Sequence, residues 1–146
     1  MKTSLRGRTL VKGFAQGEAL VTHQPISFLG GIDPDTGLIV EKEHELRGSC
    51  ITNKIFVFPY GKGSTVGTYV MFSMAKKGTK PAGIINRKTE PIIAAGCILG
   101  EIPLMDDFEK DPIEAISNGD HVIMDDVQQQ IVIRRSKPTS IVNRTG

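Results

Sequence analysis

A short apolar run followed by a glycine-rich turn is the feature that most constrains how this chain folds. The run covers residues 55–58, the turn reads Pro-Tyr-Gly-Lys-Gly-Ser over residues 59–64, and helical apolar spacing follows. A strand, a tight turn and a helix in this order place Ser64 at a helix N-terminus, where backbone N–H groups and the helix dipole favour an anion. The pattern predicts either a catalytic or anion-binding site, or a simple helix cap, because serine is a common capping residue.

The composition indicates one globular domain. The 146 residues include 39% hydrophobic and 23% charged side chains, which is enough for a single core. A formal charge of +2 and 5% aromatic residues give nucleic-acid binding no support. No apolar run approaches the roughly 20 residues that cross a bilayer, and the N-terminus lacks the apolar core of a secretion signal. We therefore expect a cytoplasmic protein that binds neither nucleic acid nor membranes.

The residues that commonly bind metals are scattered along the chain. Cys50 and Cys97 lie far apart without a CxxC pair, which predicts two reduced thiols. His23, His44 and His121 fall in three different segments, and no pair has ligand spacing. We expect no metal site within this chain.

The rest of the pattern predicts a layered α+β domain, with strands at both ends and helices in the middle. The expected strands are residues 4–12, 17–23, 38–40, 55–58, 82–86 and 102–105, with a closing hairpin of 118–125 and 130–134. The expected helices are residues 64–77, 90–99 and 111–117, with a C-cap at Gly78. The domain should span residues 1–135, and the polar tail 136–146 should fray.

Further residues could bind an anionic substrate. Lys62 adds positive potential beside the serine of the turn, and Asn86 with Arg87 and Lys88 ends a buried strand, where α/β domains commonly place functional groups. The alternative for Arg87 and Lys88 is solvated charge at a strand end. The acidic pair 106–107 is expected to be solvated loop charge.

A glycine pair interrupts the loop of residues 25–37, which otherwise carries apolar side chains. Because glycine lacks a side chain, Gly30 and Gly31 could bring this loop close to a ligand or a partner surface. A plain surface loop is the alternative.

The chain resembles the small subunit, or swivel domain, of the aconitase X family over residues 7–134. The motifs that carry the resemblance are residues 13–19, 27–33, 59–64 and 81–104. Aconitases proper have a similar serine turn followed by an arginine that binds substrate carboxylate. Here Thr65 and Val66 follow Ser64, and the missing arginine argues against citrate or isocitrate as the substrate.

The resemblance implies a swivelling β/β/α domain and a hydro-lyase that is active only with a larger partner subunit. The partner would hold a [4Fe-4S] cluster whose open iron takes the leaving hydroxyl group. Two cysteines are too few to hold such a cluster in this chain. Ser64 would be the base, its alkoxide form stabilised by the helix N-terminus. Together with the patterns above, this gives as expected substrate-binding residues Gly61, Lys62, Gly63, Thr65, Gly30, Gly31, Asn86 and Arg87.

Two branches of the family suggest different substrates. One, in archaea, dehydrates (R)-5-phosphomevalonate to trans-anhydromevalonate 5-phosphate in a mevalonate pathway of isoprenoid biosynthesis. The other, in bacteria, dehydrates cis-3-hydroxy-L-proline. The short, separate chain favours the first.

Two readings from other classes compete with the dehydratase. A phosphohistidine carrier uses the same swivelling architecture, but it needs a histidine at the glycine-rich turn. A non-catalytic interaction module would use Ser64 only as a cap and the loop of Gly30 and Gly31 as a docking surface.

Overall fold

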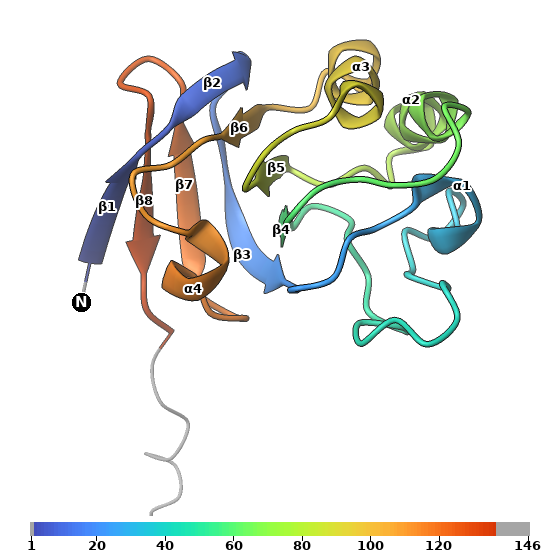
Figure 1. The fold of residues 1–146 in the computed structure, drawn as a ribbon, viewed down its shortest axis with the longest axis horizontal. Helices are drawn as coiled ribbons and strands as arrows, with labels where there is room; N and C mark the ends of the chain where they lie inside the picture. The colour runs from blue at the N-terminus through green and yellow to red at the C-terminus, as the bar shows by residue number, and fades with distance from the viewer. Residues whose placement is uncertain (1, 137–146) are drawn as a thin grey trace, which may run out of the picture.

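A computed structural model describes residues 2–136, which form two β layers and one helical layer (Figure 1). The strands are hydrogen-bonded in the order β1-β8-β7-β3-β4-β5-β6-β2. Their bounds are β1 Lys2–Arg6, β2 Arg8–Val11, β3 Ala15–Val21, β4 Ile55–Phe58, β5 Gly83–Asn86, β6 Leu104–Asp106, β7 His121–Asp125 and β8 Gln130–Arg134. The helices are α1 Phe28–Gly31, α2 Gly67–Lys77, α3 Pro91–Gly100 and α4 Pro112–Ala115.

Strand β3 joins the two β layers. Its first half pairs antiparallel with β7, and its last residues, from Ala19 to Val21, pair parallel with β4. The first layer is therefore the antiparallel set β1, β8 and β7, and the second is the parallel set β4, β5 and β6 with β2 at its edge. In Figure 1 the helices α1, α2 and α3 cover the face of the second layer that points away from the first layer.

The chain passes from one β layer to the other a second time at Gly7, between β1 and β2. Strands β1 and β2 are consecutive in the chain, yet they lie at opposite ends of the strand order. The Gly7 N–H donates to the Gln129 carbonyl at 3.0 Å, and a Cβ on Gly7 would lie 2.4 Å from the Phe108 ring. The prediction of one strand over residues 4–12 is therefore wrong, because the chain changes sheets at Gly7.

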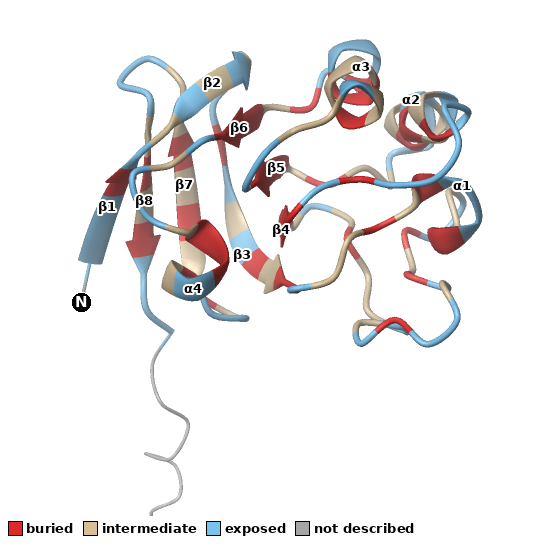
Figure 2. Cartoon of the chain, viewed as in Figure 1, coloured by how far each residue is buried: buried red, intermediate tan, exposed pale blue. Residues whose placement is uncertain are grey.

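The middle sheet is buried on both faces, as Figure 2 shows for β4, β5 and β6. Successive side chains of a strand point to opposite faces. In β4, Ile55 and Val57 accordingly join the core between the two sheets, whereas Phe56 and Phe58 join the core beneath the helices. The apolar run in the sequence is thus explained by burial on both sides.

Much of the predicted framework is confirmed. The layered α+β class, β4, β5, the β7–β8 hairpin and α3 all occur where the pattern places them. Gly78 ends α2 in the left-handed conformation with φ 78°, as a C-cap glycine does. The middle of the chain, from β4 to β6, forms two βαβ units with parallel strands.

Other boundaries differ from the prediction. Residues 38–40 form no strand, because Leu38 and Ile39 make only isolated bridges to Cys50 and Ile32. Helix α2 begins at Gly67 rather than Ser64, since the preceding turn has the tighter i→i+3 hydrogen bonds. Within the predicted loop of residues 25–37, α1 forms a short turn.

The limit of the domain at residue 135 stays a prediction. Residues 137–146 of the predicted tail lie outside the described residues. Among residues 2–136, no helix is long and apolar enough to cross a membrane.

The double burial of β4 can be tested by truncating one of its rings. Phe56 is fully buried, and its ring centroid lies 4.6 Å from that of Phe58 with the planes tilted by 43°, so Phe56→Ala should lower the free energy of unfolding by about 3–5 kcal/mol. The matched control is Phe14→Ala. Phe14 is 63% exposed, so its truncation should change the free energy of unfolding by no more than about 0.5 kcal/mol. Urea denaturation measures both, and equal losses would contradict this assignment of the core.

Candidate functional site

The carboxyl ends of the parallel strands form one edge of the middle sheet. Strands β3, β4 and β5 are adjacent and parallel, so the segments that follow them leave the sheet side by side. These are residues 22–26, residues 59–64 and residues 87–90. Ile26 and Gly61 form a parallel bridge that joins the first two segments. Ligand sites of open α/β sheets commonly lie at such an edge.

Ser64 is exposed at this edge, at the start of the turn that leads into α2. Its Oγ accepts a hydrogen bond from the Val66 N–H at 3.1 Å, and its carbonyl accepts one from the Gly67 N–H at 2.9 Å. The first bond is the i→i+2 bond of a serine turn that precedes α2, whose N-cap residue is Val66 and has no side-chain cap bond. A backbone donor in this position favours negative charge on the serine oxygen.

The glycines of the turn allow close packing against neighbouring segments. A Cβ on Gly61 would lie 2.4 Å from the Ile93 side chain on α3. Gly63 has φ +90°, and a Cβ there would lie 2.4 Å from Ser27 Oγ. Gly61 and Gly63 thus seat the Ser64 turn between α3 and the loop that carries Ser27.

The loop of Gly30 and Gly31 lies beside the start of α2. A Cβ on Gly67 would be 3.6 Å from the Leu29 nitrogen. The structure therefore brings the predicted residues 30–31 and 61–65 to one region of the surface. Lys62 lies there as well, but its Nζ is paired with Glu41 Oε2 at 2.8 Å.

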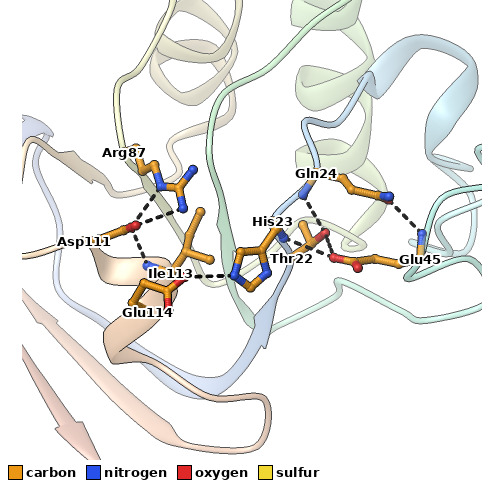
Figure 3. A network of polar contacts seen from close by, with 8 residues as sticks. All are labelled: Thr22, His23, Gln24, Glu45, Arg87, Asp111, Ile113 and Glu114. Carbon is orange, nitrogen blue, oxygen red and sulfur yellow. Dashed lines mark hydrogen bonds and ion pairs between the residues drawn. The ribbon is translucent and has the colours of Figure 1, made fainter.

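Asn86 and Arg87 lie at the end of β5, and both are engaged within the chain. The buried Asn86 amide donates to the Phe58 carbonyl at 3.0 Å and accepts from the Thr89 hydroxyl at 3.1 Å. Arg87 makes two contacts of 2.9 Å with the Asp111 carboxylate (Figure 3). This hydrogen bonding raises the pKa of Arg87 and lowers the pKa of Asp111. Their part in substrate binding stays a prediction.

Asp106 departs from the expectation of solvated loop charge. Its carboxylate is fully buried and accepts from Arg8 Nε at 2.9 Å, from Arg8 Nη2 at 3.1 Å and from the Thr89 N–H at 2.8 Å. The expectation was wrong because Arg8 on β2 lies directly across from Asp106 on β6. A buried carboxylate is tolerated when it is paired and hydrogen-bonded in this way.

A polar network after β3 was missed by sequence reasoning (Figure 3). Glu45 accepts from the Thr22 hydroxyl and from the His23 N–H, and these bonds lower the pKa of Glu45. His23 Nε2 lies 3.1 Å from Glu114 Oε2 on α4. Nearby, His23 and Glu45 line a cavity of about 440 Å³. The network connects residues far apart in the sequence, so spacing gave no signal for it.

His44 was also missed as a neighbour of the serine turn. His44 and Lys62 line the same cavity of about 260 Å³. His44 is 6% exposed, and its Nδ1 accepts from the Leu46 N–H at 3.0 Å. A ring buried in this way does not suit a carrier that must present phosphate to a partner.

The described residues do not fit an iron–sulfur cluster. Residues 2–136 contain no group of three metal-ligating side chains. Cys97 is buried in α3, and this burial raises the pKa of its thiol. Cys50 is half-buried, and its Sγ lies 3.5 Å from the Thr36 carbonyl, with which it shares a weak hydrogen bond.

Comparisons with known proteins agree in one family. The family model described as "Aconitase X swivel domain" matches residues 4–133. The phosphomevalonate dehydratase small subunit of Methanosarcina acetivorans is 49% identical, covering 94% of this chain and 95% of its own. That of Pyrococcus furiosus is 46% identical, covering 80% of this chain and 98% of its own. The crystal structure of Thermococcus kodakaraensis aconitase X in its holo-form superposes with a TM-score of 0.86 at 40% identity, covering 91% and 99% of the two chains.

Two glycines provide a matched test of the packing around the turn. Gly63 and Gly30 both have positive φ, +90° and +84°, but a Cβ on Gly30 would meet nothing within 4 Å. Alanine at either position should cost about 1–2 kcal/mol of backbone strain. Gly63→Ala should cost at least about 1 kcal/mol more, because the new methyl group meets Ser27. Chemical denaturation measures the difference, and equal costs would argue against the close approach.

The Arg87–Asp111 pair predicts a pH-dependent contribution to stability. The folded pKa of Asp111 lies below its ordinary value of 3.8, so the stabilisation is complete above that value and is lost as pH falls through the folded pKa. Asp111→Asn keeps a side-chain oxygen that can cap α4 but removes the charge. The variant should lose no more than about 1 kcal/mol at neutral pH, because both side chains are more than one-third exposed. Unfolding curves should converge at strongly acidic pH, and a constant difference would contradict the prediction.

Proposed function

Because the chain belongs to the aconitase X swivel-domain family, we propose that it is the small subunit of a hydro-lyase that dehydrates (R)-5-phosphomevalonate. The product is trans-anhydromevalonate 5-phosphate, in a mevalonate pathway of isoprenoid biosynthesis. The names of the archaeal relatives support the substrate. The exposed Ser64, with the Val66 N–H 3.1 Å from its Oγ, is the observation that supports catalysis by this chain.

Ser64 is the proposed base that removes the proton from the carbon next to the substrate carboxylate. A serine hydroxyl is a weak base at neutral pH, so its deprotonated form needs a preorganised donor. The Val66 N–H already points to Oγ, and it therefore stabilises negative charge without rearrangement at the moment of reaction. Proton transfer of this kind contributes typically 10²–10⁴-fold to an enzymatic rate.

The large subunit is the proposed partner, and we assign the [4Fe-4S] cluster to it, because the described residues of this chain do not fit one. Apolar side chains close to Ser64 support docking at this face. Three of these side chains are largely exposed: Leu29 (43%), Val66 (48%) and Tyr69 (66%). Leu29 lies in the glycine loop, and the other two lie at the start of α2. Docking there would enclose Ser64 and exclude water from the reaction.

The anionic substrate is proposed to lie over the turn and the glycine loop. The exposed residues Lys62, Gly63 and Thr65 would face it from the turn and Gly30 from the loop, whereas the buried Gly61 and Gly31 are proposed to act by placing the backbone. Asn86 and Arg87 are proposed to act from the end of β5, where Arg87 is 42% exposed. The two free cysteines fit the reducing cytoplasm that we propose as its location.

The test is the dehydration of 5-phosphomevalonate by the assembled two-subunit enzyme under anaerobic conditions. Ser64→Ala should lower kcat by about 10²–10⁴-fold while assembly and cluster content stay unchanged. Ser73→Ala is the matched control, because it removes the same hydroxyl group from within α2, outside the turn that carries Ser64. It should retain the wild-type rate.

Other outcomes separate the alternatives. If the wild-type complex dehydrates cis-3-hydroxy-L-proline instead, the mechanism stands and the substrate proposal fails. If Ser64→Ala keeps full turnover and loses only about 0.5–2 kcal/mol of stability, Ser64 is a cap and not a base.

A further inference from the structure

Glu41 connects the glycine loop to the serine turn. Its Oε2 lies 2.8 Å from Lys62 Nζ, and its Oε1 accepts a hydrogen bond from the Ser27 N–H at 3.3 Å. Its own N–H donates to the Gly31 carbonyl at 3.1 Å. One residue thus contacts both sides of the predicted site. Its side chain is 20% exposed, so the ion pair is partly shielded from water.

The segments that Glu41 connects also contact each other directly. The Lys62 N–H donates to the Ile26 carbonyl at 2.9 Å, and Gly63 packs against Ser27 so closely that a Cβ would lie 2.4 Å from its Oγ. Ser64 follows at once in the chain. A shift of Ser27 or Lys62 would therefore be passed to Ser64 through the backbone.

We propose that Glu41 is a positioning residue that holds the Lys62–Ser64 turn in its working geometry. This inference rests on the proposed function, because it assumes that Ser64 is the base. A carboxylate suits the role, since its two oxygens serve an ammonium group and a backbone N–H simultaneously. A glutamine in its place offers a single acceptor oxygen and no charge for Lys62. Small displacements of a reacting group can cost about 10²-fold in rate.

The test uses the assembled two-subunit enzyme with Glu41→Gln and a matched control, Glu43→Gln. Glu43 is exposed and makes no side-chain hydrogen bond or ion pair within residues 2–136. Glu41→Gln should lower kcat about 10- to 100-fold, with a smaller change in KM and with assembly intact. Glu43→Gln should stay within about twofold of wild type, since it removes the same charge without that contact.

Two further measurements separate positioning from a general loss of stability. Hydrogen exchange of the complex should rise in residues 59–66 of Glu41→Gln but stay unchanged in β7 and β8. Lys62→Met should also lower kcat, and the double variant should lose less than the product of the two single losses.

The outcomes distinguish this inference from the proposed function. If Ser64→Ala abolishes turnover and Glu41→Gln behaves like Glu43→Gln, Ser64 stays the base and the role of Glu41 is refuted. Independent, multiplicative losses for Glu41→Gln and Lys62→Met would also refute it. If Ser64→Ala keeps full turnover, Ser64 is not the base, and the role proposed for Glu41 is refuted with it, whereas the dehydratase function stands.

Discussion

Burial of the middle sheet on both faces is the constraint on which the rest of the structure depends. The side chains of β4, β5 and β6 alternate between the core shared with the antiparallel layer and the core beneath the helices. Neither face can therefore carry solvated chemistry. Polar groups collect instead where the parallel strands end, and the exposed Ser64 lies at that edge. The position of the candidate site follows from where apolar surface is removed from water.

The segments at this edge are held by polar contacts between residues far apart in the sequence. Asn86 ties the ends of β4 and β5 together, and Arg87 ties the same edge to α4 through Asp111. Glu41 does the same for the loop and the turn. Each contact at the surface contributes little to the stability of the domain. Together they limit how far the loops can move, which matters more for a site than for the core.

The local features of the fold could be predicted, whereas features set by long-range pairing could not. The apolar run of β4, the glycine turn and the Gly78 cap each depend on residues that are neighbours in the sequence. The same local pattern singled out Ser64, whose role as base stays a prediction. The break at Gly7 and the burial of Asp106 depend instead on partners that only the folded chain supplies. Glu41 was missed for the same reason, because Lys62 is distant from it in sequence and glutamate alone gives no signal.

The strand order also has a consequence for the path of folding. Strand β1 pairs with β8, so that Lys2 lies across from Arg134, while β2 pairs with β6. Strand β1 thus finds its partner β8 only when nearly all of the described domain has been made. Until β8 is made, β1 has no hydrogen-bonded neighbour and the outer edge of β7 is unpaired, and exposed strand edges invite pairing with other chains. Contacts of such long sequence separation also slow folding. Strand β1 is therefore the last to gain its place in the sheet, although it precedes the other described strands in the chain.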